Sequence, residues 1–161
     1  MAKPPHDQNT AASNTYFVTT SADGGRFIFQ ADRVATLFVT TLFSYREQKK
    51  YQLHEFVVMP NHVHLLITPG EGITIEKAMQ LIKGGFSFRA RKELGLVTEI
   101  WQRGYVDHRV RDASDFAQHR QYIRGNPVRG NLANSPEEFR YSSAFPGYEL
   151  DAAPQGLKPE Q

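Results

Sequence analysis

Two histidines one residue apart, His62 and His64, are the first residues in this sequence whose types and spacing could do chemistry. In an extended strand alternate side chains point to the same face, so both imidazoles share one face and Val63 takes the other. Neutral imidazole nitrogens are common ligands of divalent metals. The pair therefore predicts part of a metal site. The alternative is a surface strand that carries two histidines without any ligand role.

A second arrangement is formed by Tyr122 and Asn126, which lie four residues apart. On a helix they would be one turn apart on the same face, and His119 would share that face. The alternative is that Tyr122 is a packing residue and that Asn126 only ends the helix before Pro127. Because the residue before a proline is biased away from helical angles, we expect the helix to end near Asn126.

The two arrangements together suggest chemistry on a phosphodiester. A metal held by two imidazoles and one amide oxygen would keep positions open for a phosphate and water. A phenol has a pKa near 10 and becomes a nucleophile when a neighbouring cation or base favours the phenolate. Its attack on a phosphodiester would give a phosphotyrosine ester, which cleaves a strand without hydrolysis and conserves the bond energy for rejoining.

The charge of the chain is concentrated in one segment. The net charge is +2, but residues 83–129 hold ten Lys and Arg against five Asp and Glu, which leaves −3 elsewhere. A basic stretch interleaved with aromatic residues suits single-stranded nucleic acid, and Trp101 is expected to stack on unpaired bases. The alternative is a set of solvated helix faces. The predicted DNA-binding residues are Lys83, Arg89, Trp101, Arg103, Arg109, Arg111, Arg124 and Arg129.

The hydrophobic periodicity predicts an α+β fold in one domain. The order strand, helix, strand, strand, helix, strand, helix indicates a ferredoxin-like antiparallel sheet with helices packed on one face, plus a C-terminal helix that bears the tyrosine. The glycine pair Gly84-Gly85 is expected to weaken the second helix. The predicted strands are 16–20, 51–59, 62–68 and 101–111, and the predicted helices cover 31–45, a stretch from Thr74 to Gly95, and a stretch that starts at Asp112 or Ser114.

Length and composition set further limits. We expect a single domain over residues 14–150, with loose tails at 1–13 and 151–161. The chain has no cysteine, which excludes disulfides and thiolate metal sites. There is no run of about 18 apolar residues that could span a membrane and no apolar secretion signal, so a cytoplasmic location is the expectation.

Several motifs resemble one known family. The run 58–66, VMPNHVHLL, is similar to the single-tyrosine transposases related to insertion sequences, and its His62-Val63-His64 resembles the HUH motif of single-strand DNA nucleases. The runs 100–111, IWQRGYVDHRVR, and 122–130, YIRGNPVRG, resemble the REP-associated tyrosine transposases, which are associated with short palindromic repeats. The resemblance covers about residues 14–145 and includes the run 139–144, FRYSSA.

The resemblance implies a ferredoxin-like fold, dependence on Mg²⁺ or Mn²⁺, and cleavage of single-stranded DNA beside a hairpin. The 5′ phosphate would be left on the tyrosine and the 3′ hydroxyl would be free. Carried over by position, His62 and His64 are metal ligands, Tyr122 is the nucleophile and Asn126 is the third ligand. Related transposases have a glutamine in the role of Asn126.

Some alternatives stay open at this point. His119 and Glu55 are the next candidates for the third ligand. The protein could be a non-catalytic sequence-specific DNA-binding protein, although such a protein has no evident need for the histidines and the tyrosine together. It could be a metal-dependent nucleotide phosphohydrolase, although no glycine-rich phosphate loop is present. The expected partner is single-stranded or hairpin DNA, bound by a monomer or a homodimer.

Overall fold

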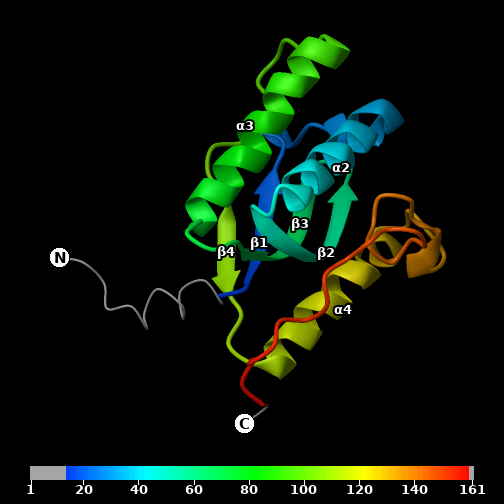
Figure 1. Ribbon diagram of the computed structural model, residues 1–161. Helices are drawn as coiled ribbons and strands as arrows, with labels where there is room; N and C mark the ends of the chain where they lie inside the picture. The colour runs from blue at the N-terminus through cyan, green and yellow to red at the C-terminus, as the bar shows by residue number, and fades with distance from the viewer. Residues whose placement is uncertain (1–13, 160–161) are drawn as a thin grey trace.

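The computed structural model describes residues 14–159, so the tail predicted at 1–13 lies outside the described residues (Figure 1). Four strands form one sheet in the order β2-β3-β1-β4, and every neighbouring pair is antiparallel. This is the strand order of a ferredoxin-like sheet and confirms the predicted fold class. The strands are β1 (Tyr16–Ser21), β2 (Tyr51–Met59), β3 (His62–Pro69) and β4 (Val106–Arg109).

The three α-helices lie on both sides of this sheet. Helices α2 (Asp32–Glu47) and α3 (Ile75–Leu94) pack against each other over one face. Helix α4 (Ala113–Arg129), which carries the tyrosine, packs against β2 and β3 and lies apart from the other two helices (Figure 1). Short 3₁₀ turns occur at Asp23–Gly25, Ile28–Gln30 and Pro136–Glu138.

The larger core lies between the sheet and helices α2 and α3. On β3 the odd-numbered residues Val63, Leu65 and Ile67 are fully buried in it, as the predicted alternation requires. Aromatic rings fill its centre, where Phe38 and Phe86 lie with ring centroids 5.4 Å apart. Burial of this apolar surface is the main contribution to the stability of the sheet.

A smaller apolar cluster fixes α4 to the opposite face of the sheet. Phe116 and Ile123 on α4 are seven residues apart, and both are buried against Leu66 of β3 and residues of β2. This spacing is two helical turns, so the two side chains anchor one face of the helix. The even-numbered residues of β3 therefore face α4, and the two histidines are among them.

The predicted end of the last helix is wrong. Helix α4 continues through Asn126 and Pro127 to Arg129 instead of ending near Asn126. Ile123, Asn126 and Pro127 are all buried in this turn, so packing against the protein outweighs the conformational bias of a residue that precedes proline.

Two other boundaries also differ from the predictions. The strand expected over 101–111 is reduced to β4, because Gly104 has a positive φ of 77° and the chain turns there. Helix α3 runs unbroken through its glycine pair to Leu94. A Cβ added at Gly85 would collide with the Tyr45 hydroxyl, so this glycine lets α2 and α3 approach closely.

The segment after residue 150 is not the loose tail predicted from its composition. Asp151 accepts hydrogen bonds from the Arg46 guanidinium at 3.0 Å and from the Leu53 backbone N–H at 2.8 Å. Further on, the N–H of Ala113 donates to the Lys158 carbonyl. The segment therefore runs back along α4, as Figure 1 shows in red. None of the helices described is both long and apolar enough to cross a membrane.

Candidate active site

His62 and His64 lie side by side at the start of β3. In the sheet His62 is opposite Ser21 and His64 is opposite Thr19, both on β1. The two ring centroids are 4.8 Å apart. The alternation of the strand therefore brings both imidazoles to the face of the sheet that α4 covers.

Each imidazole is oriented by a hydrogen bond at Nδ1. His62 Nδ1 lies 2.7 Å from the side-chain oxygen of Asn61, and His64 Nδ1 lies 2.8 Å from Thr19 Oγ1. With the Asn61 amide oxygen facing the ring, His62 donates from Nδ1 and keeps a lone pair on Nε2. The same tautomer at His64 leaves its Nε2 free, and this buried atom has no partner among the described residues.

The surroundings keep both imidazoles neutral. Burial lowers the pKa of His62. Burial, followed by the charges of His62 and Arg129, lowers the pKa of His64 to about 3. A histidine binds a metal through a neutral nitrogen, so these rings are in the required form at neutral pH.

Helix α4 brings the phenol of Tyr122 to the same place. Its ring centroid lies 5.3 Å from that of His64, in an edge-on arrangement, and its side chain is 45% exposed. Phe17 of β1 lies between the sheet and the helix, stacked on His64 at 5.3 Å and edge-on to Tyr122 at 6.0 Å. Phe17 was not among the predicted site residues, because only the pairing of β1 with β3 reveals its position.

Asn126 lies one turn beyond Tyr122 and is 8% exposed. Its amide nitrogen is buried and has no partner among the described residues. A buried polar group without a partner costs about 1–3 kcal/mol, so this amide is suited to a ligand that would satisfy it. Rotating the amide by half a turn would present its oxygen as the ligand atom, because the two ends have the same shape.

Arg129 folds back from the end of α4 over the phenol. Its guanidinium carbon lies 4.5 Å from the centre of the Tyr122 ring, and its Nη2 donates to the Tyr122 carbonyl at 2.6 Å. Gly125 provides the room, since a Cβ at that position would lie 2.6 Å from Arg129 Nη1. The site therefore holds one positive charge beside the phenol.

Glu55, one alternative for the third ligand, is engaged elsewhere. Its buried carboxylate accepts hydrogen bonds from Arg120 at 3.0 Å and Arg124 at 2.9 Å. The Ser143 hydroxyl also donates to it, at 2.5 Å. With both oxygens occupied by these partners, Glu55 is not available to a metal at the histidine pair.

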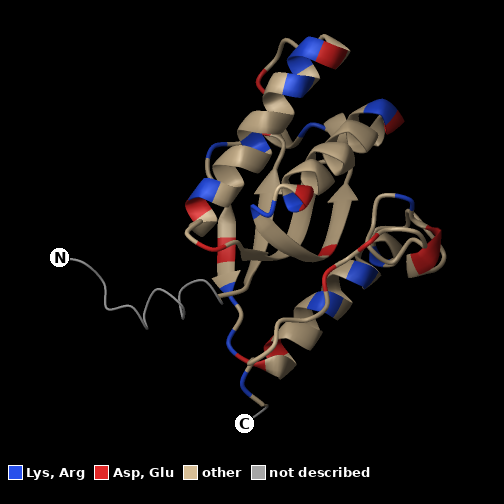
Figure 2. Ribbon diagram, in the orientation of Figure 1, with Lys and Arg blue, Asp and Glu red and all other residues tan. Residues whose placement is uncertain are grey.

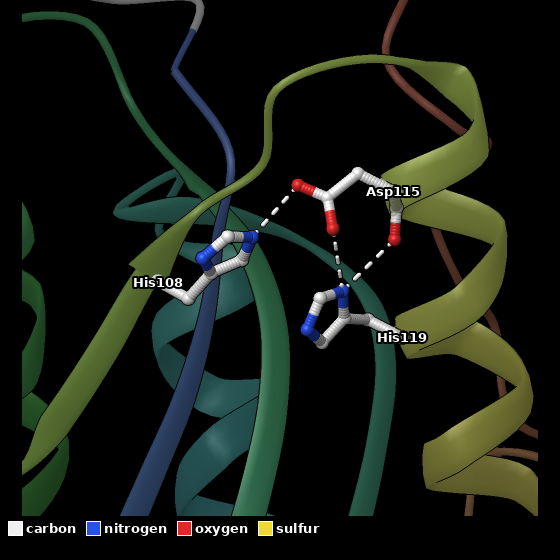
Figure 3. Close-up of side chains that lie close together, drawn as sticks. All are labelled: His108, Asp115 and His119. Atoms are coloured by element: carbon white, nitrogen blue, oxygen red, sulfur yellow. Dashed lines mark hydrogen bonds and ion pairs between the residues drawn. The ribbon is translucent and has the colours of Figure 1, made fainter. Parts of the chain in front are cut away.

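His119, the other alternative, belongs to a different cluster. Its Nδ1 lies 3.1 Å from Asp115 Oδ1, and His108 Nε2 lies 2.7 Å from Asp115 Oδ2 (Figure 3). The sequence analysis did not select His108 or Asp115. The four-residue spacing from Asp115 to His119 places both on one helix face and could have indicated their contact.

The predicted DNA-binding residues are not equally accessible. Trp101 is only 8% exposed and packs against the rings of Phe29, Phe38 and Phe86, so the expectation that it stacks on bases is wrong. A large aromatic side chain gains more from the core than from the surface.

Five of the predicted basic residues already have partners within the described chain. Arg129 donates to the Tyr122 carbonyl, and Arg111 lies 3.4 Å from the Asp115 carboxylate. Lys83 donates to the carbonyls of Gln102 and Gly104, and burial lowers its pKa. Arg89 pairs with Glu93, while Arg124 pairs with Glu55. Basic side chains are found on both α3 and α4 (Figure 2). The exposed candidates are Arg103, Arg109, Arg111 and Arg129.

Comparisons with known proteins find relatives of one kind. A REP-associated tyrosine transposase of Escherichia coli is 26% identical, over 61% of this chain and 57% of the relative. A Haemophilus influenzae protein provisionally given the same name is 27% identical, over 60% of this chain and 61% of the relative. The chain thus matches less than two thirds of the length of either relative.

The fold is also found among solved structures. The structure of a REP-associated tyrosine transposase bound to a REP hairpin has a TM-score of 0.70 and 23% identity, and covers 88% of this chain and 86% of that one. The sequence profile of the family described as transposase IS200 like matches residues 14–126, a segment that holds both the histidine pair and Tyr122. The chain therefore belongs to the IS200-like transposase family.

Proposed function

We propose that this protein is a metal-dependent single-strand DNA endonuclease and strand transferase that uses Tyr122 as its nucleophile on DNA with a hairpin. The observation that carries the proposal is the contact of the Tyr122 ring with His64, whose buried Nε2 has no partner in the part of the chain that the structure describes. A phenol beside an unused ligand atom is the arrangement needed for attack on a phosphate that a metal polarises.

Three donors could hold the metal. These are the Nε2 atoms of His62 and His64 and the side-chain amide of Asn126. Of this set, the buried Nε2 of His64 has no partner among the described residues, which fits a bound cation. The Asn126 amide would have to turn its oxygen, instead of its unpartnered nitrogen, toward the ion. Mg²⁺ or Mn²⁺ would supply Lewis-acid polarisation of the scissile phosphate when bound. Of the two, Mn²⁺ is the better match to imidazole ligands.

The residues of the chain account for the other parts of the reaction. Tyr122 Oη loses its proton and attacks the phosphorus, while the bond from phosphorus to the 3′ oxygen breaks and that oxygen takes up a proton. The 5′ phosphate then forms an ester with Tyr122. Arg129, next to the ring, places positive charge where negative charge develops. In the reverse direction, a 3′ hydroxyl attacks the ester and rejoins a strand.

The DNA would lie along the exposed basic residues. Arg103, Arg109 and Arg111 are exposed around β4 and the start of α4, and Arg129 is exposed at the end of α4. Phosphate contacts by such residues position a strand without reading its sequence. The solved relative of the same fold is bound to a REP hairpin, and this supports hairpin DNA as the substrate class.

A denaturing-gel assay tests this proposal. We expect the purified protein with Mn²⁺ and a labelled hairpin-bearing single strand to form a covalent protein–DNA adduct. Tyr122→Phe should lower adduct formation and cleavage by more than about a thousandfold, because only the attacking oxygen is lost. DNA binding should stay within a few-fold.

Tyr105→Phe is the matched control, and it should retain full activity. Adduct formation by Tyr122→Phe would overturn the assignment of the nucleophile. Tight binding without any adduct in the parent protein would favour the alternative of a non-catalytic DNA-binding protein. Undiminished cleavage in EDTA would exclude the metal-dependent reaction.

A further inference from the structure

A second cluster of potential metal ligands lies at the other end of α4. His108 comes from β4, while Asp115 and His119 come from the first two turns of the helix (Figure 3). The rings of His108 and His119 are nearly parallel, with centroids 4.8 Å apart, and both turn a nitrogen toward the Asp115 carboxylate. The three ligand atoms all lie within 4.8 Å of one another.

The carboxylate retains a free position in this cluster. Asp115 is 3% exposed, and its Oδ2 accepts from His108, from the backbone N–H of Arg111 at 2.9 Å and from the Arg111 guanidinium at 3.4 Å. Among the described residues, Oδ1 has a side-chain partner only in His119. A carboxylate oxygen has two lone pairs, so Oδ1 can bind a cation while Oδ2 keeps the Arg111 hydrogen bond.

We propose that His108, Asp115 and His119 form a second metal site, which takes a divalent cation of the zinc class and joins β4 to α4. Without a metal, His108 directs an N–H at the carboxylate, while the Nδ1–H of His119 lies between the Asp115 backbone carbonyl at 2.9 Å and Oδ1 at 3.1 Å. A cation replaces these two protons and binds the two nitrogens and Oδ1. Two imidazoles and one carboxylate form a ligand set found in zinc proteins, with the fourth position open to water. Mg²⁺ prefers oxygen ligands and fits this set poorly.

The location gives the ion a path of entry and a structural role. The side chain of His108 is 40% exposed and that of His119 is 23% exposed, so the cluster is reached from solvent. His119 is one turn before Tyr122 on the same helix. A metal bridging β4 and α4 would hold the start of this helix against the sheet. The inference does not depend on the proposed reaction, because the histidine pair on β3 takes no part in it.

Zinc binding by a variant without the first site tests the proposal. The full-length double variant His62→Ala, His64→Ala is freed of metal and titrated with Zn²⁺ in a calorimeter, and its thermal unfolding is followed. We expect one Zn²⁺ per chain, with a dissociation constant in the micromolar range or below. The midpoint of unfolding should rise with Zn²⁺ concentration, since the folded state alone binds the ion. Co²⁺ in place of Zn²⁺ should give visible absorption bands.

Further substitutions in that double variant locate the ion. His108→Gln and His119→Gln should each weaken Zn²⁺ binding by at least about tenfold. Asp107→Asn, which changes the neighbouring exposed carboxylate of β4, should leave binding unchanged. Circular dichroism in EDTA shows whether each variant folds, and His108→Gln is the safer of the two because its side chain is the more exposed.

The proposal is overturned if the double variant binds no Zn²⁺ at millimolar concentration. It is also overturned if His108→Gln and His119→Gln both fold and bind Zn²⁺ as the double variant does. In the first case the cluster would be a hydrogen-bonded network only. In the second case the ion would bind elsewhere on the chain.

Discussion

Two pairs of histidines, His62 with His64 and His108 with His119, lie where α4 meets the sheet and have opposite environments. Among the described residues, His62 and His64 form hydrogen bonds only through Nδ1, and the buried Nε2 of His64 has no partner. The pair His108 and His119 shares a buried carboxylate, and the nitrogens that face Asp115 are both bonded. The buried atom without a partner marks a site that awaits a ligand. The bonded atoms of the second pair already join β4 to α4, and the proposed metal would replace their protons without changing which elements are joined.

The two regions also differ in charge. After burial, the interactions with His62 and Arg129 lower the pKa of His64, and at neutral pH Arg129 is the cation beside it. In the other region the negative charge of Asp115 balances the basic groups around it. The first region is therefore suited to an anionic phosphate, while the second is close to neutral. This difference is more informative about function than the presence of histidine in either region.

The comparison predicts that His64→Ala has a large effect on activity. Cleavage should fall by roughly a hundredfold or more because a metal ligand is lost. The thermal midpoint of the metal-free protein should also fall, because the buried ring loses its stacking on Phe17 and its hydrogen bond to Thr19. His108→Ala is the control, and it should keep more activity but unfold at a lower temperature. Equal loss of activity in both variants would remove the distinction between the two regions.

In the satisfied region, Asp115→Asn should mainly reduce stability. We expect a loss of about 1–3 kcal/mol in the free energy of unfolding at pH 7, measured with urea, because buried hydrogen bonds to a charged group are weakened. Ser114→Ala, on the same turn, is a suitable control. If Asp115→Asn is as stable as the parent protein, the network does not fix α4.

The same carboxylate predicts a dependence of stability on pH. Burial alone raises the pKa of Asp115, but the Arg111 backbone N–H and His108 together lower it below its usual value. A lowered pKa gives a contribution that is complete above the unfolded-state pKa of about 3.9 and is lost as the pH falls through the folded-state value. Between pH 5 and pH 3, the parent protein should lose more stability than Asp115→Asn.

Asn126→Ala should have a smaller effect than His64→Ala. Loss of one amide ligand should lower cleavage by about tenfold, and raised Mn²⁺ should restore part of it, since two imidazoles remain. Stability should be unchanged or slightly higher, because a buried amide without a partner is removed. Asn126→Gln tests whether the longer amide, found in related transposases, can take its place. Full activity of Asn126→Ala at low Mn²⁺ would show that the third ligand lies elsewhere.

The smallest expected effect is a change in the salt dependence of DNA affinity when one exposed arginine is neutralised. On a log–log plot, each phosphate contact with a single strand contributes about −0.7 to the slope of affinity against salt concentration. Arg103→Gln should make the slope shallower by about this amount, because Arg103 is exposed. Arg89→Gln should change it less, since Glu93 already binds this arginine at 2.8 Å. A slope of zero in the parent protein would mean that the basic residues form only a solvated surface.

Much of the fold could be predicted from the sequence because its signals are local. Alternation placed His62 and His64 on one face, and Thr74 and Gly95 marked both ends of α3. The end of α4 could not be predicted in this way. The bias of Asn126 before Pro127 is local, and the packing that overrides it comes from the sheet.

The candidate site was likewise predictable where its residues are close in the sequence, and not where its contacts depend on the folding of distant segments. Tyr122 and the histidines were identified by spacing, but the contact of Phe17 with both depends on the pairing of β1 with β3. Arg129 was selected for its charge, whereas its position over the phenol results from the helix continuing past Pro127. Trp101 was predicted to be exposed because the residues around it in the sequence are basic. The core that buries it is formed by segments that are distant in the sequence.

Gly125 lowers the stability of α4 but leaves room for the Arg129 side chain over the phenol. Glycine within a helix is less favourable than alanine by about 1 kcal/mol. An alanine here would meet only the mobile tip of Arg129, which could swing away at little cost. The substitution should therefore favour the folded state while it moves the cation off the phenol. Selection for thermal robustness alone would replace this glycine, so its presence is consistent with a helix adjusted for reactivity at the expense of stability.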